Sequence, residues 1–88
     1  MNANRRKQIS QAIEMTRKAW DILNDVTELL NEVRDDEEDA FDNMPESLQE
    51  SERGEMMTEA IDNLDSALSL DYDDLLDELV EYLEEASA

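Results

Sequence analysis

The sequence contains no cysteine and no histidine, and it has only one glycine and one proline. These absences exclude disulfides, zinc fingers, cysteine nucleophiles and histidine acid–base catalysis. Average usage would give a chain of this length roughly ten glycines and prolines together, so their scarcity favours long helices joined by few turns. No run of about 18 apolar residues occurs, and we therefore expect no transmembrane helix.

The start of the chain, residues 1–8, is polar and basic, but no apolar core of a signal peptide follows it. We therefore expect the protein in the cytoplasm. Its 88 residues are enough for one helical domain, residues 1–88.

Acidic residues dominate the charge: 26 acidic residues stand against 7 basic ones, and the formal net charge is −19. Residues 1–18 hold five of the basic residues, whereas residues 19–88 hold 25 acidic residues and only Arg34 and Arg53. Such charge repels nucleic acid and anionic membranes, so we expect neither as a direct partner. Because 40% of the residues are apolar and they recur periodically, we do not expect a disordered acidic chain.

An eleven-residue repeat of apolar residues organises the second half of the chain. Eleven residues make three helical turns of about 3.67 residues, close to the natural helix period, so the repeat predicts one long helix over residues 56–86. Asp71 or Asp73 could instead cap a third helix, but the unbroken phase of the repeat favours a continuous helix. The repeat consists of Met57, Ile61, Leu64, Leu68, Tyr72, Leu75, Leu79, Leu83 and Ala86.

A similar repeat predicts a first helix over residues 4–42. Ile9, Ile13, Trp20 and Leu23 lie beside this repeat and widen its apolar face. A face that wide contacts more than one neighbour. The repeat consists of Met15, Ala19, Ile22, Val26, Leu30, Val33, Glu37, Phe41 and Met44, in which Glu37 is the exception.

A turn is predicted at residues 43–55. Pro45 disfavours helix at the residue before it and can begin a short helix of its own, residues 45–50. The fold class is therefore all-α, an antiparallel two-helix hairpin of the coiled-coil type. Because two wide apolar faces leave apolar edges uncovered, we expect a homodimer that completes a four-helix bundle.

A turn near residue 48 also predicts which charges meet. Arg17 and Lys18 should face Asp77 and Glu78, while the basic residues 5–7 should lie near the acidic end of the second helix. Antiparallel pairing would then offset the unfavourable cations at a helix N-terminus and anions at a C-terminus.

The acidic pairs suit a metal enzyme only in part. Glu59 with Asp62, or Glu78 with Glu81, has the spacing of the Mg²⁺ ligands in all-α nucleotide pyrophosphatases. With 26 acidic residues such pairs arise by chance, and the second helix lacks the basic residues that would hold a substrate. We therefore predict no catalytic activity, no metal site and no cofactor.

The acidic residues suit imitation of a nucleic acid better. Carboxylates three or four residues apart on a helix lie about 5–6 Å apart, and duplex DNA presents a phosphate every few ångströms. The chain could thus occupy the groove of a basic nucleic-acid-binding protein such as a nuclease or effector complex. The alternative is a structural or adaptor coiled coil that acts by self-association and has solvated acidic faces. The predicted partner contacts are Asp35, Asp36, Glu37, Glu38, Asp39, Glu55, Glu59, Asp62, Asp65, Asp73, Asp77 and Glu81.

The turn segment from Ala40 to Glu55 (AFDNMPESLQESERGE), followed by residues 60–64 (AIDNL), resembles a family of small acidic helical proteins of phages and prophages. The resemblance covers roughly residues 4–86 and carries no catalytic motif. It implies a phage context, in which small acidic proteins often block host restriction enzymes and CRISPR effectors. It therefore favours an anti-restriction or anti-CRISPR inhibitor, in the host cytoplasm, over an adaptor.

Overall fold

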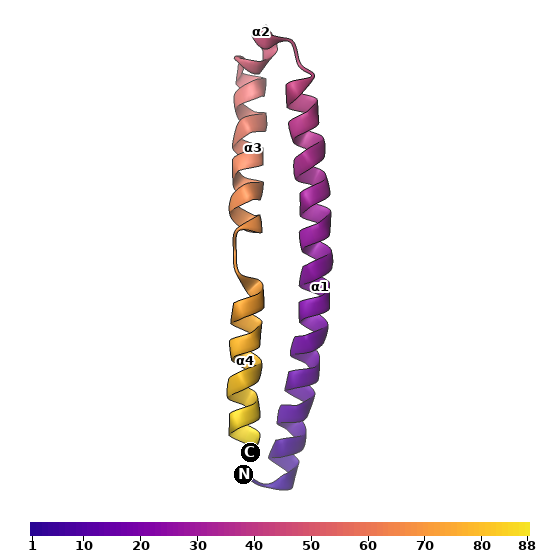
Figure 1. The fold of residues 1–88 in the computed structure, drawn as a ribbon, viewed down its shortest axis with the longest axis vertical. Helices are drawn as coiled ribbons and strands as arrows, with labels where there is room; N and C mark the ends of the chain where they lie inside the picture. The colour runs from indigo at the N-terminus through magenta and orange to yellow at the C-terminus, as the bar shows by residue number, and fades with distance from the viewer. The chain divides into compact units, whose positions relative to one another are not determined.

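The computed structural model describes all residues, 1–88, and contains helices but no strands, which confirms the all-α class. Contacts divide the chain into two compact units. The first unit combines Met1–Asp25 with Asp71–Ala88, and the second unit is Val26–Leu70. No helix has the length and hydropathy needed to cross a membrane. The helices are α1 (Ala3–Asp42), α2 (Glu46–Gln49), α3 (Glu52–Leu68) and α4 (Tyr72–Ser87) (Figure 1).

Within each unit the helices run antiparallel. In the first unit Trp20 contacts Asp73 and Arg17 contacts Glu84. The residue numbers of α4 therefore rise towards the N-terminus of α1, as expected for antiparallel helices. The two chain ends lie at the same end of this unit (Figure 1). In the second unit Arg34 of α1 contacts Asp65 of α3.

Most half-buried residues of α1 recur every seven residues, and the predicted eleven-residue repeat is right only in part, since its residues Ala19, Leu30, Glu37 and Phe41 are half-buried. Met15 and Ile22 of the predicted repeat are 69% and 62% exposed. A seven-residue period keeps one side of a helix against a neighbouring helix, whereas an eleven-residue period describes an isolated straight helix better. We call the observed set the inner line of α1. It consists of Ile9, Ile13, Thr16, Trp20, Leu23, Thr27, Leu30, Arg34, Glu37 and Phe41.

The predicted continuous helix over residues 56–86 is also wrong, because the chain leaves the helix after Leu68. The Ser69 hydroxyl donates to the Ser66 carbonyl at 2.7 Å, and the Asp71 carboxylate accepts from the Asp74 backbone N–H at 3.0 Å. These side chains supply local hydrogen bonds that compete with the helical ones. The alternative of a third helix capped by Asp71 is the observed one.

After the break, part of the apolar repeat of α4 is displaced by one residue, while Tyr72 and Leu83 of the predicted repeat are half-buried. Leu75 and Leu79 of the predicted repeat are 63% and 44% exposed, whereas Val80 is buried and Leu76 is half-buried. Ala86 is exposed as well. The inner line of α4 consists of Tyr72, Leu76, Val80, Leu83 and Ser87, and that of α3 consists of Met57, Ile61, Leu64 and Leu68.

The corner between α1 and α3 is closed by hydrogen bonds around α2. The Gln49 side-chain amide donates to the carbonyls of Phe41 and Met44, at 2.9 and 3.2 Å. The Phe41 carbonyl also accepts from the Met44 backbone N–H at 3.1 Å, so Gln49 adds a second bond there and bonds the Met44 carbonyl beyond the end of α1. Ser51 caps α3 by accepting from the Gly54 backbone N–H at 3.5 Å.

Gly54 is buried because α2 crosses directly over it. A Cβ atom at this position would lie 2.0 Å from the Gln49 carbonyl oxygen and 2.7 Å from that of Leu48. Both contacts are with backbone atoms, so a rotamer change cannot relieve them. The glycine is required by this close approach and not by its backbone angles, because no residue of the chain has a positive φ.

Substituting Gly54 with alanine tests this corner, because the change in the free energy of unfolding should have the opposite sign to that in an unobstructed helix. In an unobstructed helix the change stabilises by about 1 kcal/mol. Here the overpacked Cβ should instead destabilise the protein by about 1–3 kcal/mol, measured as a lower urea midpoint. Ser66→Ala, on the exposed side of the same helix, is the control and should leave the midpoint nearly unchanged. A higher midpoint for Gly54→Ala would contradict the close approach of α2.

Candidate partner-binding surface

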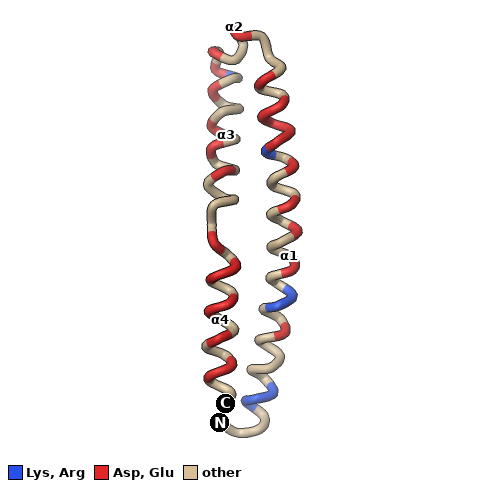
Figure 2. The backbone as a smooth tube through the Cα atoms, in the orientation of Figure 1, with Lys and Arg blue, Asp and Glu red and all other residues tan.

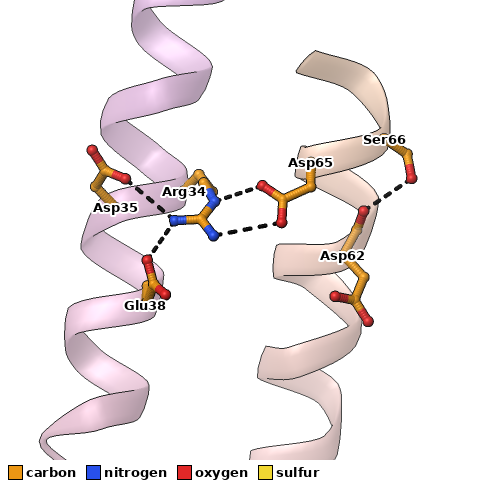
Figure 3. A network of polar contacts seen from close by, with 6 residues as sticks. All are labelled: Arg34, Asp35, Glu38, Asp62, Asp65 and Ser66. Carbon is orange, nitrogen blue, oxygen red and sulfur yellow. Dashed lines mark hydrogen bonds and ion pairs between the residues drawn. The ribbon is translucent and has the colours of Figure 1, made fainter. Parts of the chain in front are cut away.

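Arg34 is the centre of the polar contacts in the second unit. Its side chain belongs to the inner line of α1 and is 23% exposed. The guanidinium Nε donates to Asp65 Oδ1 on α3 at 2.6 Å, and Nη2 lies 3.5 Å from Asp65 Oδ2. Nη1 donates to Glu38 Oε2, one turn along α1, and lies 3.4 Å from Asp35 Oδ1. Figure 3 shows the guanidinium between the two helices, directed at the Asp65 carboxylate.

This arrangement gathers three carboxylates around one cation. The hydrogen bond to Asp65, followed by the one to Glu38, raises the pKa of the Arg34 guanidinium above its ordinary value. A guanidinium suits the position because its planar fork can bond two carboxylates at once. Arg34 therefore both joins α1 to α3 and reduces the repulsion between their acidic residues.

Replacing Arg34 with glutamine should lower the melting temperature more than replacing Arg53 with glutamine. Both changes remove one positive charge from the second unit, but Arg53 lies exposed at the start of α3. Only the Arg34 change leaves Asp35, Glu38 and Asp65 without their shared cation. Thermal unfolding followed by circular dichroism measures the difference. Equal shifts for the two variants would show that Arg34 contributes only net charge.

The acidic run at residues 35–39 does not form one uniform patch. Asp36 and Asp39 are exposed, whereas Glu37 is half-buried on the inner line. Asp35 and Glu38 are drawn to Arg34. Of the five predicted contact residues in this run, only Asp36 and Asp39 are both exposed and without an ion pair within the chain.

The predicted acidic residues of α3 divide in the same way. Glu55, Glu59 and Asp62 are exposed and make no ion pair, whereas Asp65 is held by Arg34. Each of the three unpaired residues lies three or four positions from the next, so they follow one side of α3. The backbone trace in Figure 2 shows acidic positions along the whole of this helix.

The acidic residues of α4 lie in the first unit. The Trp20 indole N–H donates to Asp73 Oδ1 at 2.6 Å, so Asp73 serves the pairing of α1 with α4. Asp77 and Glu81 are exposed and line a shallow, open depression. The full lining of this depression is Asp74, Asp77, Glu78, Glu81, Tyr82 and Glu85.

Sequence reasoning missed part of this acidic face. Asp74, Glu78 and Glu85 line the depression but were not predicted as contacts. Their helical spacing is as regular as that of the predicted residues, so the spacing alone could have found them. The role of Arg34 also had a signal, since it is the only basic residue between Lys18 and Arg53.

One predicted ion pair is displaced along α4. Arg17 was expected near Asp77 and Glu78, but its Nη2 lies 3.6 Å from Glu84 Oε1. Helical side chains lean towards the N-terminus of their own helix, so in an antiparallel pair Arg17 leans towards later residues of α4 and Glu84 leans back. Both side chains are more than half exposed, and such a pair contributes little stability.

The carboxylates are spread along the helices instead of converging on one point. No group of three or more of them is placed to hold a metal ion. Their arrangement can attract and contact a positively charged surface over some length. Comparisons with protein-family models, with curated proteins and with solved structures find no match for this chain.

The start of α4 predicts how stability depends on pH. A hydrogen bond with the Asp71 side chain, and then the negative charges of Asp71, Asp77 and Asp73, raise the pKa of Asp74. The folded state therefore binds this proton at a higher pH than the unfolded chain, whose aspartates titrate near pH 3.9. The stabilisation that this proton gives the folded state is complete below about pH 3.9. It is lost as the pH rises through the pKa of Asp74 in the folded protein.

We therefore expect the urea midpoint to rise as pH falls from 7 towards the ordinary aspartate range near pH 4. Asp74→Asn should raise the midpoint at pH 7 and weaken this pH dependence. Asp62→Asn, which removes the same charge from α3, is the control. A midpoint that falls over this range, or identical pH profiles for the two variants, would contradict the role of Asp74.

Proposed function

We propose that this protein is an acidic helical binding protein that occupies the nucleic-acid groove of a basic partner, as a DNA-mimic-like inhibitor. The observation that supports the proposal is the excess of exposed carboxylates that no cation of the chain neutralises. The second unit alone carries fifteen acidic residues against Arg34 and Arg53, a net charge of −13. Arg34 is occupied by three of those carboxylates.

Retaining so many uncompensated charges costs the protein stability through self-repulsion. A function that uses the charge explains why they are kept. Rows such as Glu55, Glu59 and Asp62 repeat at intervals comparable with the phosphates of a nucleic-acid strand. A basic groove would attract these rows from a distance, and its own substrate would then be excluded.

The partner class follows from the charge and from the resemblance described above. A nuclease or a CRISPR effector complex carries basic grooves for duplex DNA or for an RNA–DNA hybrid. The resemblance to acidic phage proteins points to such a host defence enzyme and to the host cytoplasm. The protein itself would bind no nucleic acid and catalyse no reaction in this role.

A structural or adaptor role through self-association is the alternative function. The exposed apolar residues favour it, since Met15, Ile22, Leu75 and Tyr82 are each more than 60% exposed. A homodimer that forms a four-helix bundle would cover such residues. The two functions differ in what the acidic residues do: in the adaptor they are only solvated.

Capture from a bacterial lysate on the immobilised protein separates the two functions. The bound fraction is eluted in salt steps, and in parallel with duplex DNA at constant ionic strength. The mimic should release a basic nucleic-acid enzyme in both arms. Recovery of the protein alone, or of a non-basic partner that DNA does not displace, would contradict mimicry and favour the adaptor.

Neutralising the unpaired row on α3 should weaken binding to the captured enzyme cumulatively. A single change such as Glu59→Gln should alter the Kd by no more than about threefold, because screened surface charges contribute little individually. The triple variant Glu55→Gln, Glu59→Gln, Asp62→Asn should weaken binding by about tenfold or more and reduce its salt dependence.

The matched control for this series is the triple variant Glu14→Gln, Asp21→Asn, Asp25→Asn on α1, which removes the same net charge elsewhere. Isothermal titration at two salt concentrations measures all the variants. Complete loss of binding from Glu59→Gln alone would favour a single specific contact. Equal losses for the two triple variants would show that only net charge matters.

A further inference from the structure

Both helices of the first unit carry a second apolar line beside the inner line. Its residues each come one position before an inner-line residue: Met15 before Thr16, Ile22 before Leu23, and Leu79 before Val80. They are 69%, 62% and 44% exposed. We call this second line the apolar flank. In the first unit it consists of Met15, Ala19 and Ile22 on α1, and of Leu75, Leu79 and Tyr82 on α4.

The flanks of α1 and α4 lie on the same side of the first unit. Arg17 and Glu84, which form an ion pair, each come one position after an inner-line residue. The residues one position after the inner lines of α1 and α4 therefore lie on the same side of the helix pair. Because the two helices are antiparallel, the residues one position before the inner lines lie together on the opposite side. On α4 this face is hollowed into a shallow groove lined by Leu75, Glu78, Leu79 and Tyr82.

The second unit shows the same arrangement. Val26, Leu29 and Val33 of α1 precede inner-line residues and are 40%, 57% and 45% exposed. On α3, Met56 precedes Met57 and is 65% exposed. Asp65, which bonds Arg34, follows an inner-line residue and so belongs to the charged side. In each unit the apolar flank and the charged contacts are thus on opposite sides.

We propose that the apolar flank is an isologous interface with a second copy of this chain. The surface area supports this occupant. The chain exposes 6799 Å², whereas a folded monomer of 10.2 kDa exposes about 5,300 Å². The excess of about 1,500 Å² is within the range that one subunit of an obligate homodimer buries. Only Val80 is a buried apolar side chain in the single chain, so the core is incomplete without a partner.

Charge also favours a second copy over a different protein. The flank residues of the first unit are themselves uncharged, and Glu78 is the one carboxylate that lines the groove beside them, so two copies that meet there bring few carboxylates together. Residues 1–18 of the chain carry five basic residues and one acidic residue, whereas α4 carries seven acidic residues and no basic one (Figure 2). A copy placed with its α1 beside the α4 of its partner would gain attraction between these segments. A basic protein would instead be drawn to the charged side.

The interface is independent of the proposed inhibitor function, since either function can be performed by a dimer. Its consequence for the inhibitor is that the charged sides of both copies would face outwards. The dimer would then offer two acidic faces to a partner.

Sedimentation equilibrium of the native chain and of two matched variants tests the interface. The native protein should have twice the mass of the 10.2 kDa chain at micromolar concentration. The variant Ile22→Glu, Leu79→Glu places charges on the flank and should raise the dimer dissociation constant by about tenfold or more. Asn24→Glu, on the charged side of α1, should remain dimeric. A monomeric native protein, or equal dissociation constants for all three proteins, would overturn the proposal.

A cysteine-labelling experiment covers the case in which the double glutamate variant fails to fold. The chain has no cysteine of its own, so Ile22→Cys and Asn24→Cys each introduce a single thiol. If the flank is the interface, labelling of Cys at position 22 should slow as protein concentration rises, while labelling at position 24 should not. Rates that are independent of concentration at both positions, or protection at position 24 alone, would overturn the proposal.

Discussion

The fold depends on the contacts between the inner lines of its helices, because these contacts must outweigh the repulsion within a chain of net charge −19. The inner line of α1 repeats every seven residues, and it must meet α4 in the first unit and α3 in the second. Four of its ten positions are polar: Thr16, Thr27, Arg34 and Glu37. The apolar contact between the helices is therefore limited. Polar residues of the inner line also join the helices, as Arg34 does by its hydrogen bond to the carboxylate of Asp65.

The same constraint explains where the charges lie. Cations are few, and the two that pair with another helix, Arg17 and Arg34, both bind on the side opposite the apolar flank. The remaining carboxylates of α3 and α4 are left to solvent, with Asp73 held by Trp20. One side of each helix pair is thus available for an apolar neighbour and the other for a positively charged one. The proposed self-association and the proposed inhibitor function use different sides, except at Asp36, which precedes Glu37 of the inner line and so lies on the side of the flank.

The sequence was sufficient for the helical class and for the features that local chemistry determines. The first helix was expected over residues 4–42 and runs over Ala3–Asp42, since Pro45 prevents its extension. The break after Leu68 was missed because periodicity was preferred over the hydrogen bonds of Ser69 and Asp71, which decide the local conformation. Most residues of the inner line of α1 were named, but its seven-residue period was missed because the polar members of the line conceal it. The apolar residues that were chosen instead, such as Met15 and Ile22, belong to the exposed flank.

Of the predicted contact residues, those bound by Arg34 or Trp20 could not be distinguished from the unpaired ones. Polar contacts between residues far apart in the sequence depend on how two helices pack, which the sequence pattern does not show.

The central claim is that a single chain leaves its core incomplete and that a second copy covers the apolar flank. Thermal unfolding of the native protein at two concentrations about one hundredfold apart tests this claim most directly, because association shifts the melting temperature by mass action. We predict a melting temperature several degrees higher at the higher concentration, with the same helical content before the transition. Identical melting temperatures at the two concentrations, with a single cooperative transition, would show that the isolated chain is stable by itself and would contradict the account.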